Sequence, residues 1–168
     1  MIHEYKGILP EAEKAAFIAW NAEVNGDVTL GEDSSVWYGS TLRGDIEPIV
    51  VGKGTNIQDN SVLHTKKGTP TIVGDYVTGG HGIILHSCTI GNRCLIGMGA
   101  IVLNRAEIGD ESIVGAGSLV TEGKKFPPRS VIVGSPARVV RSITDEEVES
   151  IKETAERYIK KAEEHSRG

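Results

Sequence analysis

The chain has 168 residues and a net charge of −5 with no basic block, enough length for one domain with a buried core. That charge argues against a nucleic-acid partner. The absence of a secretory apolar region and of any apolar run of eighteen residues predicts a cytoplasmic protein that does not bind membranes. Twenty-one glycines and few aromatic residues favour a fold with many corners and a narrow aliphatic core.

Residues Met1 to Pro10 are expected to form a short strand that caps one end of the fold. From Ile18 an apolar residue then returns at every sixth position, and a small residue follows each one after four positions. The first apolar positions are Ile18, Val24, Leu30, Val36 and Leu42, with Ala22, Val28, Ser34 and Ser40 as the small partners.

Two breaks interrupt this repeat. The step from Leu42 to Val51 takes nine residues, and the step from Leu63 to Val73 takes ten. The second break contains Lys66-Lys67-Gly68-Thr69-Pro70, which predicts a loop that leaves the surface. A shortened step of five residues follows, from Leu85 to Ile90. Breaks in a repeat are common places for function.

The repeat is clearest between Thr71 and Val120. A period of six fits neither a helix nor a lone strand, whose periods are 3.6 and two. It fits a short strand plus a corner, with three such units forming a triangular coil of about eighteen residues. We therefore predict an all-β solenoid, a parallel β-helix. Cys88 and Cys94 fall within the repeat and are expected to be small buried residues.

The repeat is expected to end near Val120, because Phe126-Pro127-Pro128 cannot continue a central strand. Gly134 to Arg138 indicates a turn that leads out of the prism. Thr144 and Glu147 form a capping box ahead of an amphipathic helix from Asp145 to His165, packed on the prism or on a neighbouring subunit. We divide the single domain into a β-helix, 1–141, and a C-terminal helical segment, 142–168.

Three of the five histidines, His64, His81 and His86, lie close together around the second break. A lone histidine in a repeat is most often a polar residue on an outer face. His64 and His86 each follow a core leucine and should point outward, and His81 lies in the open Gly79-Gly80-His81-Gly82 segment. Three outward imidazoles on a rigid scaffold match an open zinc site with water as the fourth ligand.

The coil period also predicts on which face of the prism each histidine lies. His64 and His86 are separated by 22 residues, about one coil plus the loop, so they should stack on one face. His81 should lie around a corner on the adjacent face. A single prism can hardly aim all three at one ion, so we predict metal sites between subunits that pack about a threefold axis.

Further polar residues accompany the histidines. Arg43 and Asp45 at the first break can pair, and a subunit interface would use such a pair for register. Gln58 or Asn56 could orient a metal-bound hydroxide or fix an imidazole. These residues and Asp59 are candidates for function or for the interface. Asparagine and aspartate also turn corners, and for Asn60 we prefer that interpretation.

These motifs resemble the γ-class carbonic anhydrases and the carbonic-anhydrase-like hexapeptide proteins grouped with them, from about residue 10 to 165. The resemblance is carried by Leu42-Arg43-Gly44-Asp45, Asn56-Ile57-Gln58-Asp59-Asn60, Val62-Leu63-His64-Thr65, Gly80-His81 and Leu85-His86. It implies a left-handed β-helix and a homotrimer. It also implies Zn²⁺, with Fe²⁺ or Co²⁺ as alternatives, bound by His64 and His86 of one subunit and His81 of the next.

The resemblance further implies roles for the neighbouring residues. Arg43, Asp45 and Asp59 resemble the residues of an intersubunit ion-pair network. Gln58 and Asn56 resemble residues that contact metal-bound solvent, and Tyr158 resembles a tyrosine near the site. The implied reaction is the reversible hydration of CO2 to bicarbonate, in which the metal lowers the pKa of its water to about 7.

The chain departs from the best-characterised active members at three places. Ile46 replaces a glutamate, Lys66-Lys67 replaces an acidic loop, and Lys160 replaces an asparagine. No proton shuttle is identified, so the sequence predicts a metal site and leaves the turnover rate open.

Two alternatives remain at this point. One is a hexapeptide acyltransferase that uses acyl-CoA, suggested by Gly134 to Val140 and disfavoured by three clustered histidines. The other is a metal-binding scaffold protein with little or no activity.

Overall fold

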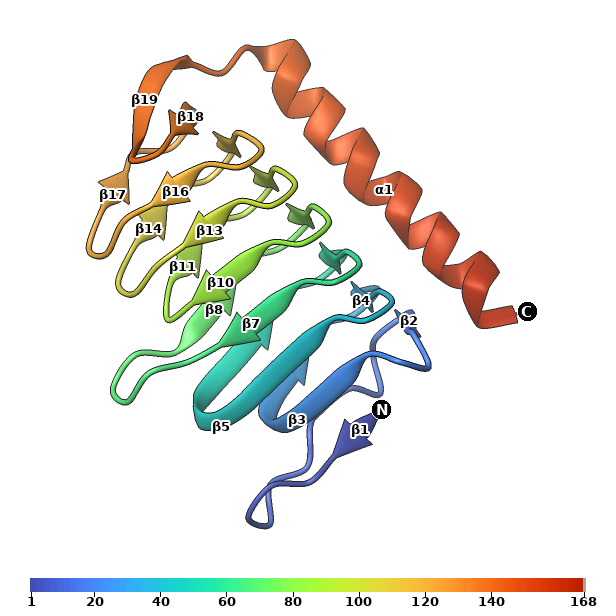
Figure 1. Cartoon of the computed structure of the whole chain (residues 1–168). Helices are drawn as coiled ribbons and strands as arrows, with labels where there is room; N and C mark the ends of the chain where they lie inside the picture. The colour runs from blue at the N-terminus through green and yellow to red at the C-terminus, as the bar shows by residue number, and fades with distance from the viewer. Residues whose placement is uncertain (168) are drawn as a thin grey trace.

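The chain forms a prism of parallel coils with one long helix along its side, in a computed structural model that describes residues 1–167 (Figure 1). Strands from successive coils pair in parallel and build the three faces of the prism. The parallel β-helix predicted from the six-residue repeat is therefore confirmed.

The first two faces belong to one sheet of eleven strands, because β3 and β5 bend from one face to the other. The first face contains β1 (Ile2–His3), β3 (Glu23–Leu30), β5 (Thr41–Val51), β7 (Val62–His64), β10 (Ile84–His86), β13 (Ile101–Val102) and β16 (Leu119–Val120). The second face contains the later halves of β3 and β5 with β8 (Thr71–Val73), β11 (Thr89–Ile90), β14 (Glu107–Ile108) and β17 (Lys125–Phe126).

The third face is a separate sheet of eight strands. Its strands are β2 (Phe17–Ile18), β4 (Ser35–Val36), β6 (Asn56–Ile57), β9 (Thr78–Gly79), β12 (Leu95–Ile96), β15 (Ile113–Val114), β18 (Ser130–Gly134) and β19 (Ala137–Ser142). All neighbours in this sheet pair in parallel except β19, which returns antiparallel to β18.

The core is a row of mostly aliphatic side chains inside the prism, contributed by the strands of all three faces. The predicted apolar positions from Val24 to Val120 are buried, and Leu42, Leu63 and Leu85 have no exposed surface. The small partners are buried too, including Cys88 and Cys94, as predicted. Burial raises the pKa of both thiols to about 12.

Successive coils approach closely where glycine follows the inward residue. A Cβ on Gly97 would lie 2.5 Å from the main-chain nitrogen of Ala116 in the next coil. The glycine half of the repeat is therefore explained by backbone contact between coils as well as by the corners.

The two sequence breaks differ in structure. The first, around Pro48, lies inside β5, which bends across two faces as one strand. The second leaves the coil as predicted, and its loop is closed by an antiparallel bridge between Lys66 and Thr69. The expected N-terminal strand is present as β1, paired in parallel with β3.

The predicted end of the repeat near Val120 is wrong. β17 and β18 add further parallel strands to the second and third faces. Pro127 and Pro128 are compatible with this because they lie at the corner between those strands, where no ladder hydrogen bond is required of them. The turn predicted from Gly134 joins β18 to the antiparallel strand β19.

Helix α1 (Asp145–Arg167) lies along the third face of its own chain, with contacts to β2, β4, β6 and β9 (Figure 1). Its capping box is formed as predicted: Glu147 N–H donates to Thr144 Oγ1 at 3.2 Å, and Thr144 N–H donates to Glu147 Oε2 at 3.0 Å. Gly168, part of the predicted segment 142–168, lies outside the described residues. Among residues 1–167, no helix has the length and apolar character needed to span a membrane.

Candidate active site

Two of the predicted histidines lie side by side on the first face. β7 and β10 pair in parallel with His64 directly opposite His86. Because Leu63 and Leu85 point into the core, both imidazoles point outward. His64 Nδ1 lies 3.2 Å from His86 Nε2. The stacking expected from the 22-residue spacing is therefore present.

Asp45 and Arg43 of β5 join this pair from the preceding coil. Asp45 Oδ1 lies 3.0 Å from His64 Nε2, and Arg43 Nη1 donates to Asp45 Oδ2 at 2.5 Å. Burial pushes the pKa of Asp45 up, but the hydrogen bonds from Arg43 and His64 outweigh it, so the pKa is lowered overall. Asp45 is therefore an ionised acceptor that holds the Nε2 edge of the His64 ring.

Asn104 joins the pair from the following coil, and the sequence analysis missed it. Asn104 Oδ1 lies 2.5 Å from His86 Nδ1. Asn104 follows β13, and it comes 18 residues after His86, which is one regular coil. The coil period applied to His86 would have found it. Arg43, Asp45, His64, His86 and Asn104 together form what we call the face-one cluster.

His81 lies elsewhere, at the corner between the third and first faces. It occupies the turn between β9 and β10, and its side chain is 45% exposed. Asp59, at the same corner in the preceding coil, places Oδ2 2.8 Å from His81 Nδ1. Asp59 therefore contacts His81 and does not join the Arg43–Asp45 pair within one chain.

The two predicted amides lie beside this corner on the third face. Gln58 Nε2 donates to Asn56 Oδ1 at 3.0 Å, and Asn56 Nδ2 donates to Thr78 Oγ1 at 3.1 Å. Both amides are buried, so this chain of hydrogen bonds holds Gln58 in place. Asn56, Gln58, Asp59, His81 and Tyr158 together form what we call the corner cluster.

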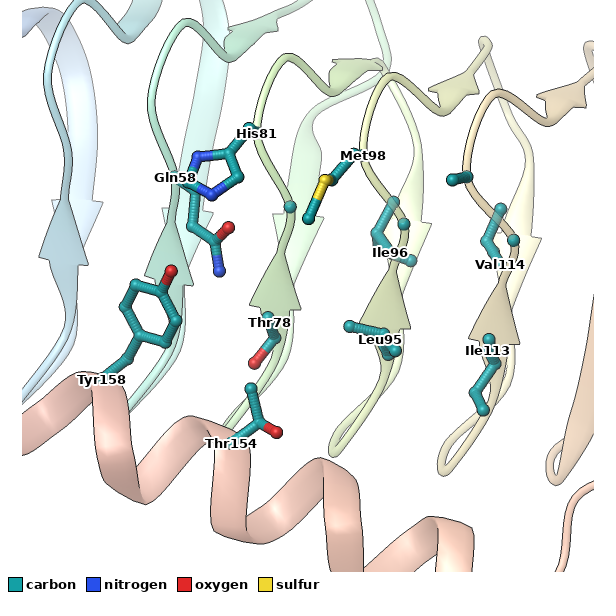
Figure 2. A pocket seen from close by; sticks show the side chains of 14 residues that line it. Gln58, Thr78, His81, Leu95, Ile96, Met98, Ile113, Val114, Thr154 and Tyr158 are labelled. Atoms are coloured by element: carbon teal, nitrogen blue, oxygen red, sulfur yellow. The ribbon is translucent and has the colours of Figure 1, made fainter.

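A mostly apolar groove of about 440 Å³ extends from this cluster between the third face and α1. Gln58, His81 and Tyr158 stand at one end of it, and Leu95, Met98 and Ile113 line the rest (Figure 2). Burial, and then the negative charge of Asp59, raise the pKa of Tyr158, so its hydroxyl stays protonated at neutral pH.

One chain therefore divides the predicted site between two surfaces. Within residues 1–167, no three histidine, cysteine, aspartate or glutamate side chains come together as a metal site. The donors themselves suit zinc, because His64 and His86 present imidazole nitrogens to each other across a partly shielded gap. His81 lies at a different corner of the same chain and does not join this pair.

Comparison with known proteins completes the description. Residues 87–122 match the family model "Bacterial transferase hexapeptide (six repeats)". A Methanocaldococcus jannaschii protein named "Probable carbonic anhydrase" is 56% identical over 87% of this chain and 92% of its own length. Gamma carbonic anhydrase 1 of Arabidopsis thaliana is 44% identical over 94% of this chain and 59% of its own length. A solved Bacillus cereus structure, described as a candidate acetyltransferase, is 42% identical with a TM-score of 0.95, covering 98% and 96% of the two chains.

Proposed function

The chain belongs to the γ carbonic anhydrase family of hexapeptide-repeat proteins, and from this premise we propose that it catalyses the reversible hydration of CO2 to bicarbonate. The proposed catalyst is a homotrimer with three metal sites. Each site takes His64 and His86 from one subunit and His81 from its neighbour.

The observation that carries this proposal is the division of the site residues between two surfaces. The face-one cluster offers two imidazoles in register, and the corner cluster offers a third imidazole with two amides and a tyrosine. Neither cluster is a complete open zinc site, which needs three protein ligands. Packing the first face of one prism against the corner of the next unites them, and threefold symmetry closes the ring.

The outer surface of the first face supports such packing. Val62 and Ile84, directly beside the histidines and opposite each other in β7 and β10, are 40% and 38% exposed. Ile101 and Leu119 continue this outward row in register on β13 and β16. An apolar row of this kind on an outer sheet face is suited to burial by another subunit.

Zinc, or Fe²⁺ or Co²⁺ in its place, would act as a Lewis acid that lowers the pKa of water to about 7. The protein holds the ligands. Asp45, paired with Arg43, accepts a hydrogen bond from His64, and the Asp59 carboxylate lies 2.8 Å from His81 Nδ1. Each carboxylate keeps its imidazole in one orientation, as the partners of metal-binding histidines commonly do.

The remaining residues shape the space where CO2 would react. Gln58 is held by Asn56 with its amide beside His81, so it is suited to bind an oxygen atom of the substrate. Tyr158 stands opposite as a neutral hydrogen-bond donor. The apolar groove beside them suits a substrate that carries no charge.

Stopped-flow CO2 hydration tests the proposal. The protein is loaded with zinc, or anaerobically with ferrous iron, and compared with His86→Ala and with the control His3→Ala. His3 forms a charge pair with Glu23 at 3.1 Å and lies outside both clusters. We expect activity in the wild type and the control, and a loss of more than about 100-fold in His86→Ala, because a metal ligand is removed.

Measurements on the same preparation distinguish carbonic anhydrase activity from the scaffold and acyltransferase alternatives. Stoichiometric zinc without hydration would contradict the catalytic proposal and leave a metal-binding scaffold. Because the related Bacillus cereus protein is described as a candidate acetyltransferase, binding of coenzyme A is measured in parallel. Tight coenzyme A binding with no bound metal would favour the acyltransferase alternative.

A further inference from the structure

Asn104 is the one member of the face-one cluster that the resemblance does not assign. It lies at the corner after β13, partly buried, with Oδ1 2.5 Å from His86 Nδ1. Its own carbonyl accepts a hydrogen bond from Gly123 N–H at 2.8 Å, so the next coil holds its backbone. The side chain is therefore presented to His86 from a fixed part of the scaffold.

This contact determines which ring nitrogen of His86 carries the proton. A carbonyl oxygen can only accept a hydrogen bond, so His86 Nδ1 must donate one. A neutral imidazole carries one proton, and placing it on Nδ1 leaves a lone pair on Nε2. That nitrogen points at His64, 3.2 Å away.

At the other end of the cluster, Asp45 fixes the tautomer of His64 in the same way. Asp45 Oδ1 accepts from His64 Nε2, which leaves the lone pair of His64 on Nδ1. Two lone pairs then face each other across 3.2 Å, an arrangement that repels unless a cation is shared between them. The distance is close to the separation of about 3.3 Å between two nitrogens that bind one tetrahedral zinc ion.

We propose that Asn104 is a positioning residue that holds His86 in the Nδ1-protonated tautomer and so keeps its Nε2 available to the metal. The inference rests on the metal site of the proposed function. Asn104 is a neutral amide, so unlike the carboxylate of Asp45 it adds no charge next to the cation. Its side chain can also turn and present its NH2 group to His86. With the NH2 group toward His86, the ring would take the other tautomer and donate Nε2–H to His64, which closes the site.

Three substitutions at Asn104 test this. Asn104→Leu keeps the size and removes the acceptor, and Asn104→Ala removes the side chain. Asn104→Asp keeps an acceptor that cannot turn into a donor. The control is Asn21→Ala, which removes an asparagine that also accepts one hydrogen bond, from Gly39 N–H at 3.1 Å. Asn21 lies between the third and first faces, three coils before His81.

Two measurements test the proposal on each protein, and a third checks its folding. Long-range nitrogen–proton NMR of histidine-labelled, metal-free protein at about pH 8.5, well above the ordinary histidine pKa of about 6.5, reports the tautomer of His86. Competition with a chelator gives the zinc dissociation constant. Thermal melting of the metal-free proteins checks that each variant is folded.

We expect His86 to carry its proton on Nδ1 in the wild type, in Asn104→Asp and in the control. In Asn104→Leu and Asn104→Ala we expect the Nε2-protonated tautomer to become dominant and zinc to bind about 10- to 100-fold more weakly. The proposal is overturned if the wild type carries the proton on Nε2, or if Asn104→Leu changes neither the tautomer nor the zinc affinity. Wild-type protein that binds no zinc would instead contradict the proposed function, and the tautomer of His86 would still be decided.

Discussion

The coils from Thr89 to Val120 and the coils from Thr41 to His86 share one core and differ on their outer surface. In both regions the inward residues are fully buried aliphatic side chains, such as Ile96 in the first and Leu63 in the second. The regular coils keep the six-residue step throughout. The irregular coils contain the bent strand β5, the Lys66–Thr69 loop and the shortened step before Ile90.

Nearly all of the predicted site lies in the irregular coils. They supply His64, His81, His86 and the carboxylates that hold them. The regular coils supply Asn104, and the helix supplies Tyr158. The comparison indicates that the core sets the scaffold and that outward residues and corner lengths set the function.

The largest effect on stability is expected from the shared core. Leu63→Ala and Ile96→Ala should each lower the free energy of unfolding by about 2–5 kcal/mol, because both side chains are fully buried. Urea unfolding of metal-free protein measures this. A harmless Leu63→Ala beside a damaging Ile96→Ala would show that the irregular coils are not held by the same core.

Substitutions at two aspartates distinguish an effect on zinc binding from an effect on stability. Asp45→Ala should weaken zinc binding about 10- to 100-fold, because it removes the acceptor for His64. Asp110→Ala, in the regular coils, removes only the acceptor for Asn92 N–H. It should cost about 1 kcal/mol of stability and leave zinc binding unchanged. Equal loss of zinc in both variants would argue against a specific role for Asp45.

Alanine substitutions at two glycines compare how closely the backbone is packed in the two regions. Gly97→Ala should cost about 3 kcal/mol, because its Cβ would collide with the backbone of the next coil. Gly68, in the Lys66–Thr69 loop, has open space where a Cβ would go, and its φ is +80°. Gly68→Ala should cost only about 1 kcal/mol, from the left-handed backbone. Thermal melting of the two variants checks the order.

The smallest effect concerns the start of α1, the helix that covers the third face. Hydrogen bonds from Arg141, and then from Thr144 N–H, lower the pKa of Glu147 from 4.5 to about 2. A lowered carboxyl pKa stabilises the folded state above pH 4.5, and this contribution is lost as the pH falls towards 2. The stability difference between wild type and Glu147→Gln should therefore shrink across that range, as followed by urea midpoints. A constant difference would contradict the assigned hydrogen bonds.

Much of the scaffold could be predicted from the sequence because a six-residue period has few structural explanations. The inward row, the buried cysteines and the capping box at Thr144 all followed from spacing and residue type. The hand of the coil could not, since a period is the same for either hand and only the resemblance supplied it. The end of the repeat was misplaced because Pro127 and Pro128 fall on a corner, where proline is tolerated.

The site was predictable where it follows the coil period. Spacing placed His64 beside His86 and put His81 around a corner. Spacing could not show that Asp59 contacts His81 while Asp45 contacts His64, since that depends on which side of each corner a side chain takes. Asn104 was missed because a single asparagine in a regular coil carries no signal until it is aligned with His86.

The central claim is that two copies of the chain complete each site, and mixing two inactive variants tests it most directly. His81→Ala keeps the face-one cluster, and His86→Ala keeps the corner cluster. Each variant is prepared alone, then both are unfolded together, refolded with zinc at equal amounts and assayed for CO2 hydration.

Random threefold assembly leaves about one site in four with both intact halves, because each half is intact in half of the subunits. We therefore predict that the mixture recovers about a quarter of the wild-type activity while each variant alone stays inactive. A mixture that forms oligomers and remains as inactive as its components would contradict a site shared between subunits.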